Sequence, residues 1–397
     1  MTNRKKWEEK QVNLSTAIIV GAFVALVGAI IGLNWNTWFS GTILSNKSKN
    51  VIDWSSLDTI YEKLAKNYNG DIDVDELVEG AKEGMVAALG DKYTVYLNAE
   101  RAEDYYNDLH GVVGAGIGVE MGVRDGYTKV LRTLPDNPAR RAGILAGDII
   151  YKIDDEEVWE LTSEEIAKKV RGEAGTKVKV TIARDGESKD FEMVREEINN
   201  VSAYVDYDGD IAIISVKRFD NDTGKKVQEM AAEFKNKGVK KVVLDLRNNG
   251  GGYVSAAVDL LSLWLDEKEV IEQKSKHREN FVSKTSSGKD LLKDMKTVVL
   301  VNGSTASASE IVAGALKEYD IAKLVGEQTY GKGVVQTLLQ IGDGSILKTT
   351  TAEWFTPNGV SINNVGVSPD VVVERSFDDV NKMLDPQLDK AKELLNE

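Results

Sequence analysis

Ser307 and Lys332 are the two residues whose types and spacing in this sequence could perform catalysis. A serine hydroxyl attacks a carbonyl only when a base takes its proton. The chain has two histidines, His110 and His277, so a neutral lysine is the more economical base. The pair predicts a serine hydrolase that works without a histidine triad.

The residues around Ser307 predict the start of a helix. A strand predicted at 297–301 ends, a turn of small residues follows, and an apolar stripe at helical spacing begins at Ala308. Unpaired N–H groups and the positive end of the helix dipole at that position would stabilise an oxyanion. Serine is also a favoured N-cap, so these residues alone leave a purely structural role open.

Lys332 is flanked by Gly331 and Gly333 and followed by an apolar run at 334–339. A lysine has a reference pKa of about 10.4, and burial lowers it, as a base requires. Gln336 would face Lys332 in a helical turn but would lie about 13 Å away in a regular strand. A lone glycine-flanked lysine is also typical of a surface position or a phosphate contact.

Two glycine-rich runs could present backbone N–H groups. The run 244–252 ends a predicted strand with three glycines, which suit a second oxyanion donor, and it lacks the Lys-Ser/Thr of a phosphate loop. It also contains Asp245 and Arg247, a candidate structural ion pair. The run 114–119 does not have the spacing of a dinucleotide fold, and we interpret it as a loop that captures a peptide's C-terminal carboxylate beside a strand edge.

The elements that must position these residues form a mixed α/β fold. Residues 55–107 have helical periodicity, and Gly90 is placed as a C-cap. Residues 177–182 alternate like a half-buried strand, whereas 211–216, 241–246 and 297–301 are continuously apolar like buried strands. Helices are predicted at 227–234 and 307–317, between strands.

The N-terminus predicts a membrane anchor. Residues 14–33 carry no charge and would span about 30 Å as a helix. Four basic residues precede them, which keeps the N-terminus in the cytoplasm, and Trp35 and Trp38 suit the far interface. A cleaved signal peptide is the alternative, but no small-x-small cleavage site follows the apolar run.

Composition excludes several classes of protein. The chain has 397 residues, a formal net charge of −14 and no cysteine. The charge argues against a nucleic-acid surface, and the absence of cysteine excludes disulfides and thiolate metal sites. We expect no metal and no cofactor.

Taken in order, the motifs resemble those of the carboxy-terminal processing proteases, also called tail-specific proteases. The resemblance covers residues 50–375 and is carried by 116–119, 138–148, 171–176, 244–252, 305–310, 329–333, 356–359 and 366–370. It implies a PDZ domain followed by a protease core.

The resemblance also implies residue roles. Ser307 would be the nucleophile, Lys332 the general base and Gln336 the residue that orients the lysine. The oxyanion hole would use backbone N–H groups of Ala308 and the Gly251 region. Ser309 is the alternative nucleophile, and Glu310 is interpreted as a capping or structural acid.

In the PDZ domain, the C-terminal tail of a substrate would bind at the four residues 116–119 and at Arg171, the first residue of the motif at 171–176. These substrate-binding residues are Gly116, Ile117, Gly118, Val119 and Arg171.

The sequence therefore predicts a membrane-anchored serine endopeptidase that recognises C-terminal tails outside the cytoplasm. The predicted parts are a cytoplasmic tail at 1–13, an anchor at 14–34, a linker at 35–50, a helical region at 51–109, a PDZ domain at 110–199, a protease core at 200–375 and a helical segment at 376–397. The helical segments suggest a homodimer. The alternative function is a non-catalytic PDZ tether that binds protein C-termini.

Overall fold

The computed structural model describes residues 53–397 apart from 125, 185 and 383. The predicted anchor at 14–34 and linker at 35–50 lie outside this range. Within it, no helix is long and apolar enough to cross a membrane. The chain divides into two units, residues 1–77 and 78–397, which are described separately.

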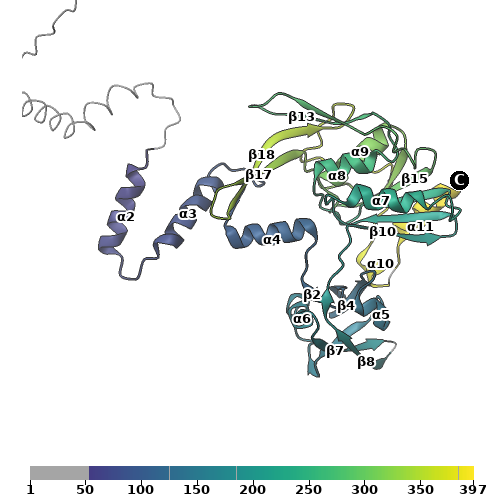
Figure 1. Ribbon diagram of the computed structural model, residues 1–397, viewed down its shortest axis with the longest axis horizontal. Helices are drawn as coiled ribbons and strands as arrows, with labels where there is room; N and C mark the ends of the chain where they lie inside the picture. The colour runs from purple at the N-terminus through teal and green to yellow at the C-terminus, as the bar shows by residue number, and fades with distance from the viewer. Residues whose placement is uncertain (1–52, 125, 185, 383) are drawn as a thin grey trace, which may run out of the picture. The chain divides into compact units, whose positions relative to one another are not determined.

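Helix α2 (Ser55–Asn67) is the helix that lies wholly within the described part of the first unit, and none of its residues is buried (Figure 1). Its exposed apolar residues are Leu57, Ile60, Tyr61 and Leu64. These positions follow helical spacing and share one face. Helix α3 (Val74–Ala87) spans the boundary between the units, and Gly90 has a positive φ of 69°, as the predicted C-cap requires.

The protease core is built on a six-stranded sheet. Its strand order is β10 (Ala203–Asp208), β11 (Ile211–Val216), β12 (Lys241–Asp245), β15 (Lys296–Val301), β16 (Ala322–Gly326) and β19 (Val371–Val372). Strand β10 is antiparallel to β11, and all later neighbours pair in parallel.

Both faces of this sheet are covered, which explains its continuously apolar strands. Helices α7 (Thr223–Ala232), α8 (Val254–Leu261) and α9 (Ala308–Glu318) pack with one another on one face (Figure 1). In β12, Val242 and Leu244 belong to that cluster, whereas Val243 belongs to the cluster on the other face. Successive residues of a strand point to opposite faces, so no polar residue lies between Lys241 and Asp245, the two ends of β12.

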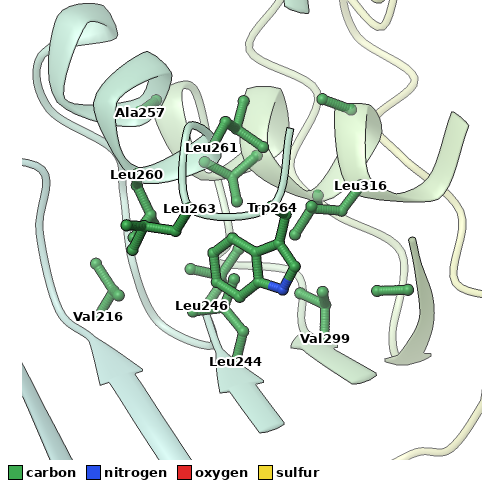
Figure 2. Close-up of a cluster of buried hydrophobic side chains, with 14 of the residues drawn as sticks. Val216, Leu244, Leu246, Ala257, Leu260, Leu261, Leu263, Trp264, Val299 and Leu316 are labelled. Atoms are coloured by element: carbon green, nitrogen blue, oxygen red, sulfur yellow. The ribbon is translucent and has the colours of Figure 1, made fainter. Parts of the chain in front are cut away.

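Trp264 lies at the centre of the larger cluster and is 1% exposed. Figure 2 shows its indole surrounded by leucines of β12, α8 and α9, among them Leu244, Leu260 and Leu316. Its Nε1 donates a 3.0 Å hydrogen bond to Thr297 Oγ1, which satisfies the buried indole N–H. This packing fixes the helices whose N-termini face the site.

The opposite face of the sheet is covered by the C-terminal helix. Helix α11 (Pro386–Asn396) follows the short α10 (Phe377–Asn381) and buries Ala391 and Leu395 against β12, β15 and β16. Its apolar face is therefore used within the chain. The suggestion that the segment at 377–396 supports a dimer therefore gains no support from this face, and the dimer stays a prediction.

A second β-rich part spans residues 115–197. Its sheets contain β3 (Val119–Arg124), β4 (Tyr127–Thr133), β5 (Ile149–Ile153), β6 (Glu156–Glu157), β7 (Lys177–Arg184) and β8 (Glu187–Val194), with a separate pair of β2 (Ala115–Gly116) and β9 (Glu196–Glu197). Helices α5 (Pro138–Ala142) and α6 (Ser163–Val170) complete it around its own apolar cluster. Thr162 and Glu165 cap α6 reciprocally.

A third sheet contacts helix α9 through strand β13, and its strand β17 begins two residues after the predicted base, Lys332. It contains β1 (Val95–Leu97), β13 (Glu269–Lys274), β14 (Phe281–Lys284), β17 (Val334–Gln340) and β18 (Ile346–Phe355). Helix α4 (Ala99–His110) is capped by Asn98 and ends at Gly111, with φ 69°. Residues 55–107 are therefore not continuously helical, because β1 pairs with β18.

Candidate active site

Ser307 stands immediately before helix α9 with an unusual backbone conformation. Its φ of 56° is positive, which a serine rarely adopts. Gly251 approaches it so closely that a Cβ there would lie 2.8 Å from Ser307 Cβ and 2.9 Å from Ala306 O. Only glycine fits at 251, so the three-glycine run is placed against the candidate nucleophile.

The buried carboxylate of Glu310 holds the segments of Ser307 and Lys332 together. Its Oε2 accepts hydrogen bonds from the backbone N–H groups of Ser307 at 2.8 Å and Lys332 at 2.9 Å. Its Oε1 accepts from Gly331 N–H at 2.7 Å and from Thr329 Oγ1 at 2.6 Å. Glu310 is 0% exposed, so four donors replace its water shell. Its interpretation as a structural acid agrees with these contacts.

Ser309 is not available as a nucleophile in this structure. Its side chain is fully buried, and its Oγ donates a 3.0 Å hydrogen bond to Asn249 O. Ser307 is partly exposed and lines a cavity. Burial thus favours Ser307 over Ser309, as the motif did.

Lys332 Nζ donates a 2.8 Å hydrogen bond to Gln336 Oε1. Gln336 Nε2 donates in turn to Tyr93 O, which fixes the orientation of the amide. The Lys332 main chain is held by the indole of Trp354, whose Nε1 donates to Lys332 O at 2.9 Å. Both the side chain and the backbone of Lys332 are therefore positioned.

Burial lowers the pKa of Lys332 from 10.5 to about 8. The positive charge of Lys348 lowers the pKa further, and the negative charge of Glu310 opposes the shift. Val334 is 8% exposed and the Tyr93 ring centre lies 5.4 Å from Lys332 Nζ, so apolar groups surround the amine. At pH 7 about a tenth of the lysine would be neutral.

Gln336 reaches Lys332 although it lies in strand β17, where regular geometry would separate them. The pairing of β17 with β18 shifts register between Val335 and Gln336, and such a bulge redirects a side chain. Lys332 precedes the strand, between two glycines packed against 363–366: a Cβ at Gly331 would lie 2.8 Å from Gly366 N, and one at Gly333 would lie 2.6 Å from Asn363 N. The bulge and the glycines together allow the contact.

The predicted oxyanion donors differ in this structure. Ala308 begins α9, where the first N–H groups have no acceptor within the helix. The N–H of Gly251, by contrast, donates a 2.9 Å hydrogen bond to Asn249 Oδ1. The assignment of the Gly251 region as a donor therefore stays a prediction, and in this conformation the Gly251 proton is engaged by Asn249.

Ser307, Lys332 and Gln336 line one cavity of about 610 Å³. Residues 250–252 form part of its wall, and Trp354 and Ile311 contribute apolar surface. A cavity of this size takes several residues of a peptide. The three predicted catalytic residues are thus brought to one place.

A second cavity, of about 240 Å³, lies in the β-rich part and contains all five predicted tail-binding residues. Gly116, Ile117, Gly118, Val119 and Arg171 line it together with apolar side chains such as Leu134 and Val170. Strand β3 is at the end of its sheet and contacts α6. An edge strand beside a helix is the arrangement in which a peptide adds as a further strand.

Comparisons with known proteins agree with this organisation. The family model of peptidase family S41 matches residues 210–373, and the PDZ domain model matches 115–194. The N-terminal domain model of the activating protease CtpB matches residues 40–101. A "Probable CtpA-like serine protease" of Staphylococcus saprophyticus is 34% identical over 363 residues, which cover 91% of this chain and 72% of the relative. The chain belongs to peptidase family S41.

Further relatives fit the same assignment. A CtpA-like protein of Staphylococcus aureus is 34% identical over 378 residues, covering 93% of this chain and 73% of that protein. The photosystem II D1 C-terminal processing protease is 28% identical with a TM-score of 0.51, covering 88% and 93% of the two chains. An S41 protease structure from Bacteroides fragilis shares the fold, with 15% identity and a TM-score of 0.60 over 87% and 97%. The chain is an S41 serine peptidase with a PDZ domain.

In this S41 peptidase, the predicted Asp245–Arg247 pair is present and extends further. Arg247 donates to both oxygens of Asp245, at 2.9 and 2.8 Å, and to both oxygens of Asp385, at 2.7 and 2.9 Å. Burial alone would raise the pKa of Asp385, but the hydrogen bonds and charge of Arg247 lower it overall. The pair joins the end of β12 to the start of α11.

Sequence reasoning missed several residues around the S41 site. Tyr93, Trp354 and Lys348 contact or influence Lys332 but belong to no motif that contains it. Tyr93 precedes Gln336 by 243 residues. A contact at that separation has no local signal, although the alternating strand around Lys348 and Trp354 could have been recognised as a sheet neighbour.

The Glu310 network leads to a testable prediction. Glu310→Gln keeps the shape of the side chain but places an amide N–H₂ against donors, so at least two charge-assisted hydrogen bonds are lost. We expect the free energy of unfolding to fall by about 3 kcal/mol or more, measured by denaturant titration of the core. The matched control is Glu353→Gln, an exposed carboxylate of β18, which should change stability by less than about 0.5 kcal/mol. Equal stability of the two variants would contradict this role for Glu310.

Proposed function

We propose that this S41 peptidase is an endopeptidase in which Ser307 and Lys332 form a catalytic dyad. The observation that carries the proposal is the half-buried Lys332, hydrogen-bonded to Gln336 and lining the same cavity as Ser307. A lysine whose pKa is lowered to about 8 by burial can exist as the neutral base that a serine nucleophile requires.

The proposed reaction has two halves. Ser307 Oγ attacks the scissile carbonyl while Lys332 Nζ takes its proton, and the oxyanion accepts a hydrogen bond from Ala308 N–H. Lys332 then returns the proton to the leaving amine, which leaves an acyl-enzyme ester on Ser307. Water, deprotonated by Lys332, hydrolyses that ester. A second donor from the glycine run requires Gly251 N–H to release Asn249.

Gln336 is proposed as a positioning residue. Its Oε1 accepts from Lys332 Nζ while its Nε2 is held by Tyr93 O. A neutral acceptor orients the amine and, unlike a carboxylate, does not add a full negative charge that would raise the pKa of the lysine. The low pKa of Lys332 and its fixed orientation are therefore compatible.

The dyad predicts how mutation and pH change peptide cleavage. Ser307→Ala and Lys332→Ala should each lower kcat/KM by about a thousandfold or more. In the parent protein, kcat/KM should rise with pH and reach half its maximum near pH 8, because only the neutral amine of Lys332 accepts the proton of Ser307. Lys332→Arg, which stays charged, should remain inactive throughout this range. Parent-like rates in any of the three variants would refute the mechanism.

We also propose that the PDZ domain recruits the C-terminal tail of the substrate. The cavity lined by residues 116–119 supports this, because glycine-rich backbone next to an edge strand can bind both a terminal carboxylate and an added strand. Arg171, the C-cap residue of α6, lines the same cavity and would sense the bound tail or couple its binding to the core.

Tail recognition is testable with peptides that differ at one end. A free-acid tail peptide should bind about tenfold more tightly than its C-terminal amide, measured by fluorescence anisotropy on the catalytically inactive Ser307→Ala protein.

Arg171→Ala should weaken binding or cleavage, whereas Arg140→Ala, an exposed arginine of the same domain outside the cavity, should not. If Arg171→Ala leaves both unchanged, the role of Arg171 is refuted.

Residues 14–34 are proposed as a single-pass membrane anchor, with the catalytic part outside the cytoplasm. The uncharged segment and the basic residues before it support this orientation. The protein should fractionate with membranes, and protease added outside intact cells should degrade its catalytic part. Recovery of the intact chain in the soluble fraction would contradict the anchor.

A homodimer is proposed from the apolar face of α2. Leu57, Ile60, Tyr61 and Leu64 are each at least 38% exposed, which is costly for a lone helix in water. Sedimentation of a protein that begins at residue 36 should give a dimer mass, and Ile60→Asp should convert it to a monomer. A parent protein that is monomeric at micromolar concentration would rule out this dimer.

A further inference from the structure

The cavity around Ser307 has a charge opposite to that of the chain. Four basic side chains line it, Lys217, Arg218, Lys332 and Lys348, against the single acidic side chain of Asp108. The chain as a whole carries a formal net charge of −14. The positive charge of the cavity therefore does not follow from the overall composition. Lys332, the proposed base, accounts for only one of its four cations.

Lys348 is a partly buried cation of this cavity whose charge no carboxylate in the described part of the chain compensates. It is only partly exposed, and burial lowers its pKa with no opposing contribution from a carboxylate. Its Nζ lies 4.9 Å from the ring centre of Tyr105, a weak substitute for an anion. Among the described residues, no carboxylate lies within 4.0 Å of Lys348. A partly buried cation without a counter-ion is unfavourable until an anion arrives.

Lys217 and Arg218 complete the basic wall from another element. Lys217 follows β11 and, within the described ranges, also lacks a carboxylate partner; its Nζ lies 5.7 Å from the Tyr204 ring centre. Arg218 contacts Asp220 at 3.2 Å, but its buried Nε has no acceptor. Lysines elsewhere are commonly paired, as Lys179 is with Asp155 at 2.8 Å and Lys317 with Asp370 at 2.9 Å. Lys217 and Lys348, which have no such partner in the ranges that the structure describes, both line the substrate cavity.

Lys348 also lies close to the reacting atoms. Gln336, which accepts a 2.8 Å hydrogen bond from Lys332 Nζ, pairs with Thr350 of β18, and Lys348 lies two residues from Thr350 on the same face of that strand. Lys348, Gln336 and Ser307 line one cavity, and the charge of Lys348 contributes to the lowered pKa of Lys332. An extended peptide advances about 3.3 Å per residue. A carboxylate that reaches Lys348 would therefore belong to a residue within about two positions of the scissile bond.

We propose that Lys348, together with Lys217, selects substrates with aspartate or glutamate side chains next to the scissile bond. The inference rests on the proposed peptidase mechanism and names the substrate class of that site. A carboxylate bound there gains charge-assisted hydrogen bonds and supplies the missing counter-ion. The overall charge of −14 would repel acidic peptides, so a preference for them must originate in the cavity.

The test compares matched peptides with the full-length protein in detergent. A peptide that it cleaves, with the site mapped by mass spectrometry, is made with Glu or with Gln at the two positions on each side of the scissile bond. The ratio of kcat/KM for the Glu and Gln peptides is measured for the parent, for Lys348→Met with Lys217→Met, and for the control Lys235→Met. Lys235 is exposed and outside the cavity. Because both peptides are cleaved by the same variant, the ratio of their kcat/KM values cancels any effect of Lys348 on the pKa of Lys332.

We expect the parent and Lys235→Met to prefer the Glu peptide by about tenfold, and the double variant to show a ratio near one. A ratio near one in the parent, or a preference that persists in the double variant, would overturn the inference while leaving the mechanism intact. A preference that disappears when both peptides are amidated at the C-terminus would assign the carboxylate to the chain end and also overturn it. If the full-length protein cleaves no peptide at all, so that no site can be mapped, the proposed mechanism itself is contradicted.

Discussion

The site depends on one buried carboxylate. Glu310 is the third residue of α9, and its two oxygens accept four hydrogen bonds, from the backbone of Ser307, Gly331 and Lys332 and from the Thr329 hydroxyl. Together with the 3.0 Å hydrogen bond from Tyr330 N–H to Thr305 O, these bonds keep the segment of the base beside the helix of the nucleophile. A fully buried carboxylate is stable only when all its acceptor positions are used, so the interaction imposes the relative placement of both segments.

The same constraint explains the backbone around Ser307. The residue adopts a positive φ between the end of a buried strand and a helix packed on all sides, and Gly251 approaches it to within contact distance. Strain of this kind persists only where the surroundings determine it completely. Here the cluster around Trp264 fixes α9, and Glu310 fixes the backbone at both Ser307 and Lys332.

The setting of Lys332 is a balance between desolvation and orientation. Burial and Lys348 lower its pKa, whereas Glu310 raises it, and the neutral amide of Gln336 holds the amine without cancelling the shift. The groups that achieve this come from α9, β17 and β18 and from Tyr93, which precedes β1. The same cavity leaves Lys348 and Lys217 without counter-ions, so the electrostatics that favour a neutral base also create a surface for anions.

The sequence by itself determined the elements and the candidate chemistry, because these depend on local patterns. Continuously apolar strands, the helix start after Ser307 and the glycine-flanked lysine all follow from side-chain periodicity and backbone sterics. It did not determine whether Gln336 reaches Lys332, because a register shift between β17 and β18 decides that contact. Nor could it show that Gly251 N–H is engaged by Asn249, that Tyr93 holds Gln336, or that α11 buries its apolar face in the core. These contacts join residues that are far apart in the sequence, such as Tyr93 and Gln336, through hydrogen-bond geometry and packing that only the tertiary structure sets.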